Sequence, residues 1–161
     1  MSKVEEMLKE KKGLIVMLDG IQDVHNLGAI IRTCECAGVD GVIYKSHNAV
    51  KVNDTVAKVA SGALEYMKVA EVTNLVNTIR KLKEKGYWIV GSDGSADRLY
   101  TDLDYDMNTV LVIGSEGKGM SRLVREECDF IVKLPMKGHV TSLNASVAAG
   151  ILVYNILSAR K

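Results

Sequence analysis

The sequence has little of what marks a membrane, secreted or metal-binding protein. Among its 161 residues, no apolar run is long enough to cross a bilayer, and the charged start, residues 1–13, lacks the apolar region of a signal peptide. The three cysteines, Cys34, Cys36 and Cys128, cannot all pair, and together with the histidines they form no recognisable zinc spacing. We therefore expect a cytoplasmic protein with reduced thiols, no metal and no membrane contact.

Proline and net charge are scarce as well. The only proline is Pro135, and we find no internal repeat, low-complexity tract or linker, which predicts a single domain. The net charge of +1 excludes a general basic field for nucleic acid. Six basic residues would form a local cluster if the fold gathers them, and otherwise are scattered solvated charges: Arg32, Lys118, Arg122, Arg125, Lys133 and Lys137.

Short β-rich apolar runs alternate with segments of helical periodicity. Strands are predicted at residues 14–18, 41–44, 67–72, 87–92, 109–114 and 130–134. Helices are predicted at residues 27–37, 54–61, 73–85, 121–127 and 143–159, after a charged lead-in helix at 2–12. Continuous apolar strands between amphipathic helices predict an α/β fold, with a mostly parallel sheet and helices on both faces.

A glycine-rich loop, GSEGKGM, occupies residues 114–120 after a predicted strand. In open α/β sheets ligands bind beyond the carboxyl ends of the strands, where the segments 19–32, 114–120 and 135–146 would also lie. The loop has neither the Walker spacing nor the G-x-G-x-x-G spacing of a dinucleotide-binding protein. Glu116 would repel a phosphate, which favours a neutral or cationic ligand. The alternative is a tight turn that uses glycine for its positive φ.

The helix predicted at 27–37 carries an arginine on its polar side. Asn26 is a good N-cap for this helix. Four residues share the face predicted to be buried: Leu27, Ile30, Ile31 and Cys34. Gly28, Arg32 and Glu35 share another face. Arg32 either pairs with Glu35 or, in open space left by Gly28, meets a phosphate bidentately.

The last predicted helix begins in SLNASVAAG, residues 142–150. Ser142 or Ser146 is expected to cap it. The small residues 145–150 allow close approach of another backbone, either within the chain or at a dimer face. Ser142 and Asn144 would also offer a hydroxyl and an amide to a site at the helix start, beside the free N–H groups of its first turn.

Three of these segments together carry a family resemblance: DVHNLGAIIR, LVIGSEGKGM with CDFIVKLPM, and SLNASVAAG. In order and spacing they resemble the motifs of the SpoU-type (TrmH-like) RNA ribose methyltransferases of the SPOUT class. The resemblance runs from about Leu14 to about Leu157 and is strongest to the group that methylates a guanosine ribose in bacterial 23S rRNA. It implies a homodimeric RNA 2′-O-methyltransferase that uses S-adenosyl-L-methionine without a metal, with tRNA as the rival substrate. A non-catalytic RNA-binding relative of the same fold is the alternative.

The resemblance also implies a domain layout and a site. Residues 13–161 would be the catalytic domain, with a C-terminal deep trefoil knot, behind a lead-in segment at 1–12. The implied cofactor-binding residues are Gly114, Glu116, Ile131, Leu134, Met136, Ser142 and Leu143. The implied catalytic residues are Asn26, Arg32, Glu116, Ser142 and Asn144.

Two points of this resemblance stay open. Arg32 matches the arginine held to be catalytic, but a free arginine is a poor base because its pKa exceeds about 12. It therefore either has an unusual environment or clamps the phosphate and stabilises the developing alkoxide.

The ribosomal group also typically carries a separate N-terminal RNA-binding domain, where this sequence has only residues 1–12.

Overall fold

The computed structural model describes residues 2–45 and 54–161, with strands and helices that alternate along the chain. The strands are β1 (Leu14–Asp19), β2 (Gly41–Lys45), β3 (Val69–Val72), β4 (Trp88–Ser92), β5 (Arg98–Leu99), β6 (Thr109–Gly114) and β7 (Phe130–Lys133). The helices are α1 (Ser2–Glu5), α2 (Val24–Ala37), α3 (Asp54–Ala60), α4 (Leu75–Glu84), α5 (Arg122–Glu127) and α6 (Ala145–Ala159), with 3₁₀ turns η1 (Ala63–Glu65) and η2 (Tyr100–Asp102).

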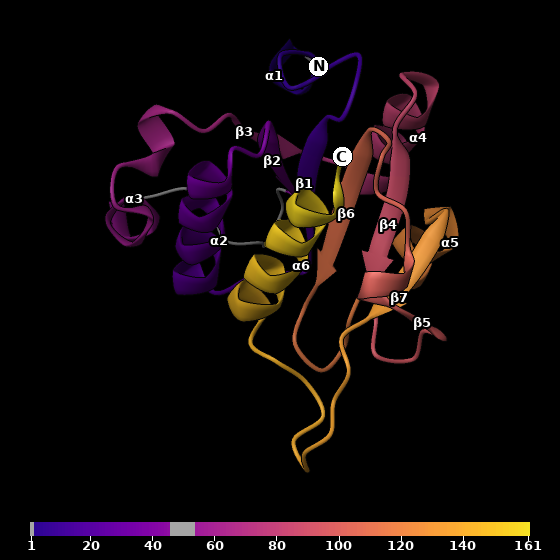
Figure 1. The fold of residues 1–161 in the computed structure, drawn as a ribbon. Coiled ribbons are helices and arrows are strands. Elements are labelled where there is room, and N and C mark those ends of the chain that lie inside the picture. The colour runs from indigo at the N-terminus through magenta and orange to yellow at the C-terminus, as the bar shows by residue number, and fades with distance from the viewer. Residues whose placement is uncertain (1, 46–53) are drawn as a thin grey trace.

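All seven strands form one parallel sheet in the order β3-β2-β1-β6-β4-β7-β5 (Figure 1). The register joins Leu14 to Thr109 and Asp19 to Gly114, so β1 and β6 end together at the centre of the sheet. The parallel α/β fold predicted from the sequence is confirmed. The two-residue β5 was not predicted, because a strand that short shows no periodicity.

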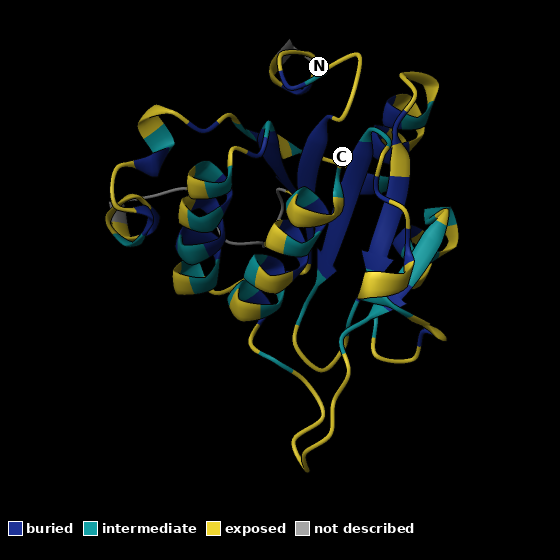
Figure 2. Cartoon of the chain, viewed as in Figure 1, coloured by how far each residue is buried: buried dark blue, intermediate teal, exposed yellow. Residues whose placement is uncertain are grey.

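Apolar layers cover both faces of the sheet, as a parallel sheet requires. One layer packs β1, β4 and β6 against α2 and α6, and its helix residues include Leu27, Ile31, Leu152 and Ile156. The other layer packs the same strands against α4 and α5. Figure 2 shows the strands buried and the outer sides of the helices exposed. None of the helices in the described ranges is both long and apolar enough to span a membrane.

The lead-in segment is helical over a shorter stretch than predicted. The expected helix at 2–12 was too long, since α1 ends at Glu5 and a turn follows, closed by a hydrogen bond from Met7 N to Val4 O of 3.0 Å. Val4 and Met7 are 2% and 1% exposed and belong to the core layer that faces α4. The chain turns there because these two side chains pack against the end of the sheet.

Glycine is required at one of two helix contacts on this face of the sheet. A Cβ at Gly150 of α6 would lie 3.7 Å from Thr33 Cγ2 of α2. A Cβ at Gly28 of α2 would lie 2.7 Å from Val59 Cβ and 2.9 Å from the Val56 carbonyl oxygen of α3. The expected open space beside Gly28 is therefore absent, because α3 fills it. Close packing within the chain therefore accounts for Gly28, whereas a Cβ at Gly150 would make only an ordinary van der Waals contact.

Candidate functional site

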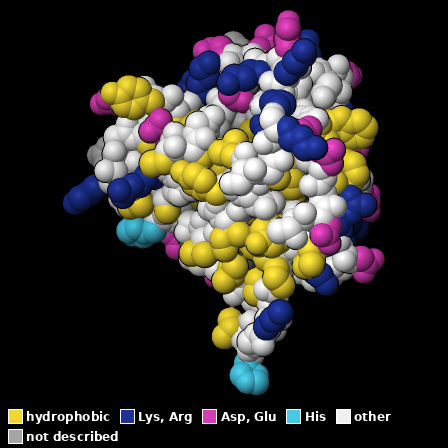
Figure 3. Space-filling view, in the orientation of Figure 1, with side chains coloured by type: hydrophobic (Ala, Val, Ile, Leu, Met, Phe, Trp, Pro, Cys, Tyr) yellow, Lys and Arg dark blue, Asp and Glu magenta, His cyan; other side chains and the backbone are white. Residues whose placement is uncertain are grey.

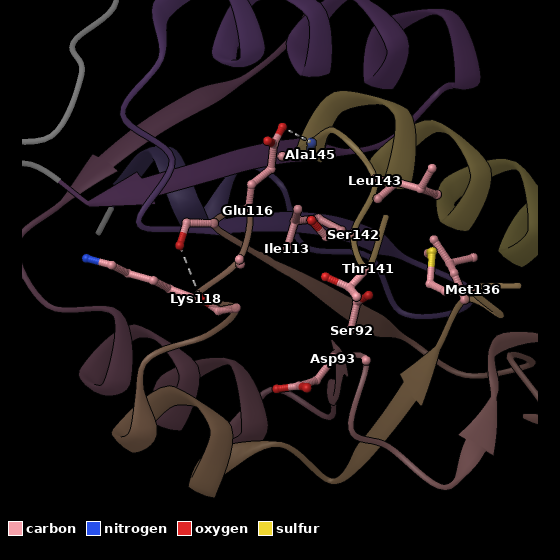
Figure 4. Close-up of a pocket in the computed structure, with 17 residues that line it drawn as sticks. Ser92, Asp93, Ile113, Glu116, Lys118, Met136, Thr141, Ser142, Leu143 and Ala145 are labelled. Atoms are coloured by element: carbon pink, nitrogen blue, oxygen red, sulfur yellow. Dashed lines mark hydrogen bonds between the residues drawn. The ribbon is translucent and has the colours of Figure 1, made fainter. Parts of the chain in front are cut away.

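A cavity of about 260 Å³ lies beyond the carboxyl ends of β4 and β6 (Figure 4). Its walls come from residues 92–94 at the end of β4, residues 113–119 at the end of β6, and parts of residues 134–148, which lead from β7 into the first turn of α6. Six residues predicted to bind a cofactor line it: Gly114, Glu116, Leu134, Met136, Ser142 and Leu143. The fold thus brings together segments that are far apart in the sequence, at the edge where parallel sheets bind ligands.

Ile131 does not line this cavity, although the sequence placed it with the cofactor residues. It lies in β7 opposite Gly91 and packs against the core layer that faces α4 and α5. Successive residues of a strand point to opposite faces of the sheet, and the side chain of Ile131 faces away from α6. It lines a separate hollow beside Arg98 and Phe130.

The glycine-rich loop closes on itself. Ser115 N donates to Gly119 O at 3.2 Å and Gly119 N donates to Ser115 O at 2.8 Å. Gly117 and Gly119 have φ values of 76° and 69°, a region that glycine adopts without strain. A Cβ at Gly114 would overlap the backbone of Gly119. The loop is thus a tight turn with positive φ at these glycines, and the same turn forms one wall of the cavity.

Glu116 joins this loop to the start of α6. Its Oε1 accepts a hydrogen bond of 3.1 Å from Ala145 N, a first-turn donor of the helix (Figure 4). The cap of α6 is Asn144, whose Oδ1 accepts from Ser146 N at 2.9 Å and Val147 N at 3.4 Å. The expected capping by Ser142 or Ser146 was wrong, because the helix begins at Ala145, between the two serines. Glu116 therefore braces the loop against α6.

Two aspartates at strand ends hold the surroundings of the cavity. Asp19, at the end of β1, is 9% exposed and accepts from Ser121 N at 2.7 Å and Ser121 Oγ at 2.9 Å. Asp93, which follows β4, lines the cavity, accepts from the N and Oγ of Ser95 at 2.9 Å each, and pairs with Arg125. Sequence reasoning missed both, though each is an acidic residue at the end of an apolar strand.

The ionisation of Asp93 follows from these contacts. Burial raises its pKa, but the hydrogen bonds from Ser95 and the neighbouring Arg125 outweigh burial, so the net pKa of Asp93 is lowered. Asp93 and Glu116 thus bring two carboxylates to the cavity, against the single lysine Lys118, which extends away from the other lining residues in Figure 4. This balance disfavours a polyphosphate ligand and tolerates a cationic one.

A shallower hollow of about 340 Å³ adjoins the cavity and shares Ser115, Glu116 and Ala145 with it. Asn26 and Asn144 also line this hollow. Asn26, Glu116 and Asn144, which come from three separate motifs, therefore meet around one space beside the cavity.

Asn26 is not the N-cap of α2, contrary to the expectation. The cap is Asp23, whose Oδ1 accepts from His25 N at 2.7 Å and Asn26 N at 3.3 Å. The helix thus begins earlier, at Val24. The amide side chain of Asn26 makes no hydrogen bond within the described chain, which leaves it available in the hollow.

Arg32 lies elsewhere. It is exposed on α2 and lines another hollow, of about 310 Å³, with Ser61 and Tyr66 among its neighbours. Within residues 2–45 and 54–161, Arg32 and Glu35 form no ion pair, so the pairing considered from the sequence is not made. In this single chain, Arg32 reaches neither the cavity nor the hollow that adjoins it.

Of the six basic residues that would either cluster or scatter, two form ion pairs. Arg122 contacts Glu126 at 2.9 Å, and Arg125 pairs with Asp93. On the face shown in Figure 3, Lys and Arg side chains alternate with Asp and Glu, whereas hydrophobic side chains gather in the centre and below it.

The cysteines are unpaired, as expected. Burial raises the pKa of the Cys34 and Cys128 thiols to about 12, and Cys36 is exposed. Among residues 2–45 and 54–161, His, Cys, Asp and Glu form no group of three or more that could hold a metal. His47 lies outside the described residues.

Comparisons with known proteins agree on one family. A sequence profile of the SpoU rRNA Methylase family matches residues 13–154. A Staphylococcus haemolyticus protein, named for the TrmH family of tRNA/rRNA methyltransferases, is 51% identical over 154 residues, which are 94% of this chain and 62% of that protein. The chain therefore spans less than two thirds of that relative.

Two solved structures share the fold. The SpoU methyltransferase AviRb from Streptomyces viridochromogenes, in complex with the cofactor AdoMet, is 27% identical with a TM-score of 0.90, over 96% of this chain and 63% of that chain. The TrmH/SpoU tRNA modifying enzyme of A. aeolicus is 32% identical with a TM-score of 0.84, over 98% of this chain and 80% of that chain.

Proposed function

The chain belongs to the SpoU rRNA methylase family, and from that membership we propose that it transfers a methyl group from S-adenosyl-L-methionine to a ribose 2′-hydroxyl of RNA. The observation that carries this proposal is the cavity at the ends of β4 and β6. It lies in a fold that matches an AdoMet-bound structure with a TM-score of 0.90. The three segments that carry the recognised motifs also meet at this cavity and its neighbouring hollow.

The residues of the cavity fit the cofactor. Ile113, Leu134 and Leu143 offer apolar contacts for an adenine ring, and Ser92, Thr141 and Ser142 bring hydroxyl-bearing side chains to the wall. S-adenosyl-L-methionine supplies an activated methyl group on a cationic sulfonium. The carboxylates of Asp93 and Glu116 favour such a cation electrostatically.

The adjoining hollow supports a place for the acceptor nucleotide. Asn26 and Asn144 line it, and it meets the cavity at Glu116. In this proposal the two asparagines orient the ribose, Ser142 lies on the cofactor side, and Glu116 keeps both walls in register through Ala145 N. Holding acceptor and methyl donor in line supplies much of the rate.

Arg32 and the outer face of α6 together support a homodimer. Val147, Ile151 and Tyr154 recur along α6 at helical spacing and are 49%, 38% and 47% exposed. Burying this stripe against a second copy would remove apolar surface from water. We propose that Arg32 of the second copy approaches the hollow of Asn26, where its guanidinium clamps the acceptor phosphate and stabilises the developing alkoxide.

We further propose that the C-terminal segment forms the knot implied by the family, within a catalytic domain of residues 13–161. The chain leaves β6, crosses to β7 on the far side of β4, and returns through residues 134–144 to α6. The contact between Glu116 and Ala145 N, where the returning chain meets the 115–119 loop, supports this threading.

For the substrate we propose a guanosine of 23S rRNA, with tRNA ribose as the alternative. The family is named for rRNA, the Staphylococcus relative for both tRNA and rRNA, and the A. aeolicus structure for tRNA. Methyl transfer to undermodified 23S rRNA and to tRNA, measured side by side, separates the two.

The first experiment is calorimetric titration with S-adenosylhomocysteine, with ATP and NAD as controls. We expect saturable binding near one molecule per chain and none with the controls. Radiolabelled methyl transfer to RNA, followed by alkaline hydrolysis, then identifies the product, because a 2′-O-methyl group blocks cleavage of the adjacent phosphodiester. Label recovered in mononucleotides would indicate base methylation and contradict the proposal. RNA binding without transfer would favour the non-catalytic relative.

The second experiment tests Arg32. Arg32→Ala is expected to abolish transfer and leave S-adenosylhomocysteine affinity within about twofold of the wild type, because Arg32 lies outside the cavity. Mixing this variant with a cofactor-site variant such as Leu143→Glu, under conditions that exchange subunits, should restore part of the activity. Failure to restore any activity, with mixed dimers present, would place Arg32 in its own chain's site.

A further inference from the structure

We propose that the hollow beside Arg32 binds an unpaired nucleotide of the RNA, with its base stacked on Tyr66 and its phosphate on the Arg32 guanidinium. The proposal rests on RNA being the substrate, as set out above, and adds a recognition site for it. Since the proposed function assigns Arg32 to the acceptor phosphate, the nucleotide concerned is the neighbour of the methylated one.

The first observation is the exposure of Tyr66. Its side chain is 77% exposed and lies in the same hollow as Arg32, Ser61 and Gly62. Neither the Tyr66 hydroxyl nor the Arg32 guanidinium has a hydrogen-bond or ion-pair partner among residues 2–45 and 54–161. An exposed aromatic ring beside a free arginine is the pair of groups with which proteins bind single-stranded nucleic acid.

The second observation is that the backbone at Tyr66 is anchored, although its ring is exposed. Tyr66 N donates to Ala63 O at 3.0 Å and Met67 N donates to the same oxygen at 2.9 Å. Ala63 and Met67 on either side of it are buried, at 6% and 7% exposure, in the core layer that faces α2. The ring is therefore presented from an anchored turn, so that stacking of a base has to order the Tyr66 side chain but not its backbone.

The size of the hollow suits one nucleotide, and its charge limits how many phosphates it can hold. Its volume of about 310 Å³ lies at the lower end of the range for small-ligand sites. Glu35 and Glu65 also line it, so a single arginine faces two carboxylates. These carboxylates would repel a second phosphate, whereas they accept hydrogen bonds from the amino groups of guanine, cytosine or adenine. A single phosphate with an amino-bearing base satisfies all of these groups.

The test uses the whole chain and a fluorescently labelled, mixed-sequence, single-stranded RNA oligonucleotide. Tyr66→Ala is expected to weaken its binding about tenfold, and Tyr66→Phe by less than about twofold, because phenylalanine keeps the stacking face. Leu123→Ala, which truncates another exposed side chain on α5, is the matched control and should change nothing. Substituting 5-iodocytidine in the oligonucleotide should give a photo-crosslink to the peptide that contains Tyr66.

The outcomes separate this proposal from the proposed function. Unchanged RNA affinity in Tyr66→Ala, with no crosslink to its peptide, would overturn the nucleotide site even if methyl transfer is intact. A crosslink at Tyr66 in a chain that neither binds S-adenosylhomocysteine nor transfers methyl groups would support the site and sink the proposed function. If Tyr66→Ala alters the oligomeric state and leaves RNA affinity unchanged, the hollow is a protein contact and the nucleotide site is wrong.

Discussion

The two ends of the sheet are built differently. At the amino-terminal edge of the strands, Asn108 donates to the carbonyls of Lys9 and Glu10 and accepts from Gly13 N. Arg160 donates to backbone carbonyls around it. At the carboxyl-terminal edge, residues 135–142 are exposed throughout and, within the described chain, make no backbone hydrogen bond to other segments (Figure 2).

This difference between the two edges suggests that one edge serves stability and the other serves ligand binding. The side chains of Asn108 and Arg160 tie residues 9–13 to the amino edge, whereas the carboxyl edge keeps only a few fixed points, such as Glu116 with Ala145 N and Asp19 with Ser121. Loops with few internal contacts are free to accommodate a ligand. We therefore expect substitutions at the amino edge to change the free energy of unfolding, and those at the carboxyl edge to change ligand affinity.

Met7→Ala should have the largest effect. The Met7 side chain is 1% exposed and lies over Gly41, where a Cβ would overlap it. Its truncation leaves a cavity and should cost about 3 kcal/mol of unfolding free energy. Urea denaturation measures this cost, and calorimetry should find unchanged S-adenosylhomocysteine affinity in the folded variant. The exposed Lys11→Ala is the control. A cost below about 1 kcal/mol would mean that the lead-in segment is not part of the core.

Arg160→Ala should follow, with a cost of about 2 kcal/mol. Arg160 donates to the carbonyls of Lys12, Gly13, Tyr105 and Met107, which would lose a charged donor. Thermal and urea unfolding report the loss. Arg160→Lys should recover only part of it, since an ammonium group cannot reproduce the planar set of donors. If Arg160→Lys recovered the full unfolding free energy of the wild type, the positive charge alone would account for the contribution of Arg160.

The sequence predicted the elements better than their junctions. The apolar runs identified six strands, and periodicity identified the buried face of α2, with Leu27, Ile30, Ile31 and Cys34 all fully buried. The helix caps were misassigned because each helix start offers two suitable capping residues. These are Asp23 and Asn26 at α2, and Ser142 and Asn144 at α6. Which one caps a helix depends on where its first turn meets the rest of the fold.

The site was predictable only in part. Motif order brought Gly114, Glu116 and Ser142 to one cavity, but spacing could not show that Ile131 faces the opposite side of the sheet. Asp19 and Asp93 act through tertiary hydrogen bonds, and Asp19 meets a partner more than a hundred residues away. Such contacts leave no local pattern in the sequence.

At the carboxyl edge, Glu116→Ala should weaken S-adenosylhomocysteine binding about tenfold, equivalent to about 1.4 kcal/mol. Without the bond to Ala145 N, the 115–119 loop loses its brace on α6. Glu116→Gln keeps an acceptor oxygen and should bind nearly as the wild type. If the glutamine variant binds S-adenosylhomocysteine normally but transfers no methyl group, the charge has a role in catalysis beyond bracing. Equal S-adenosylhomocysteine affinity in the wild type and both variants would show that the bond from Ala145 N to Glu116 does not contribute to cofactor binding.

Asp93→Asn should have the smallest effect, and one that depends on pH. Because the pKa of Asp93 is lowered in the folded chain, its carboxylate stabilises the fold above the unfolded-state value of about 3.9. That contribution is lost as the pH falls through the lower folded-state pKa. The free energy of unfolding of the wild type should therefore exceed that of Asp93→Asn by less than about 1 kcal/mol at neutral pH, since solvent screens the ion pair between Asp93 and Arg125. The urea midpoints of the wild type and Asp93→Asn, measured from neutral to acid pH, should converge as the pH falls. Parallel curves would mean that the carboxylate gains nothing from folding, and that the cavity wall depends on the shape of this side chain alone.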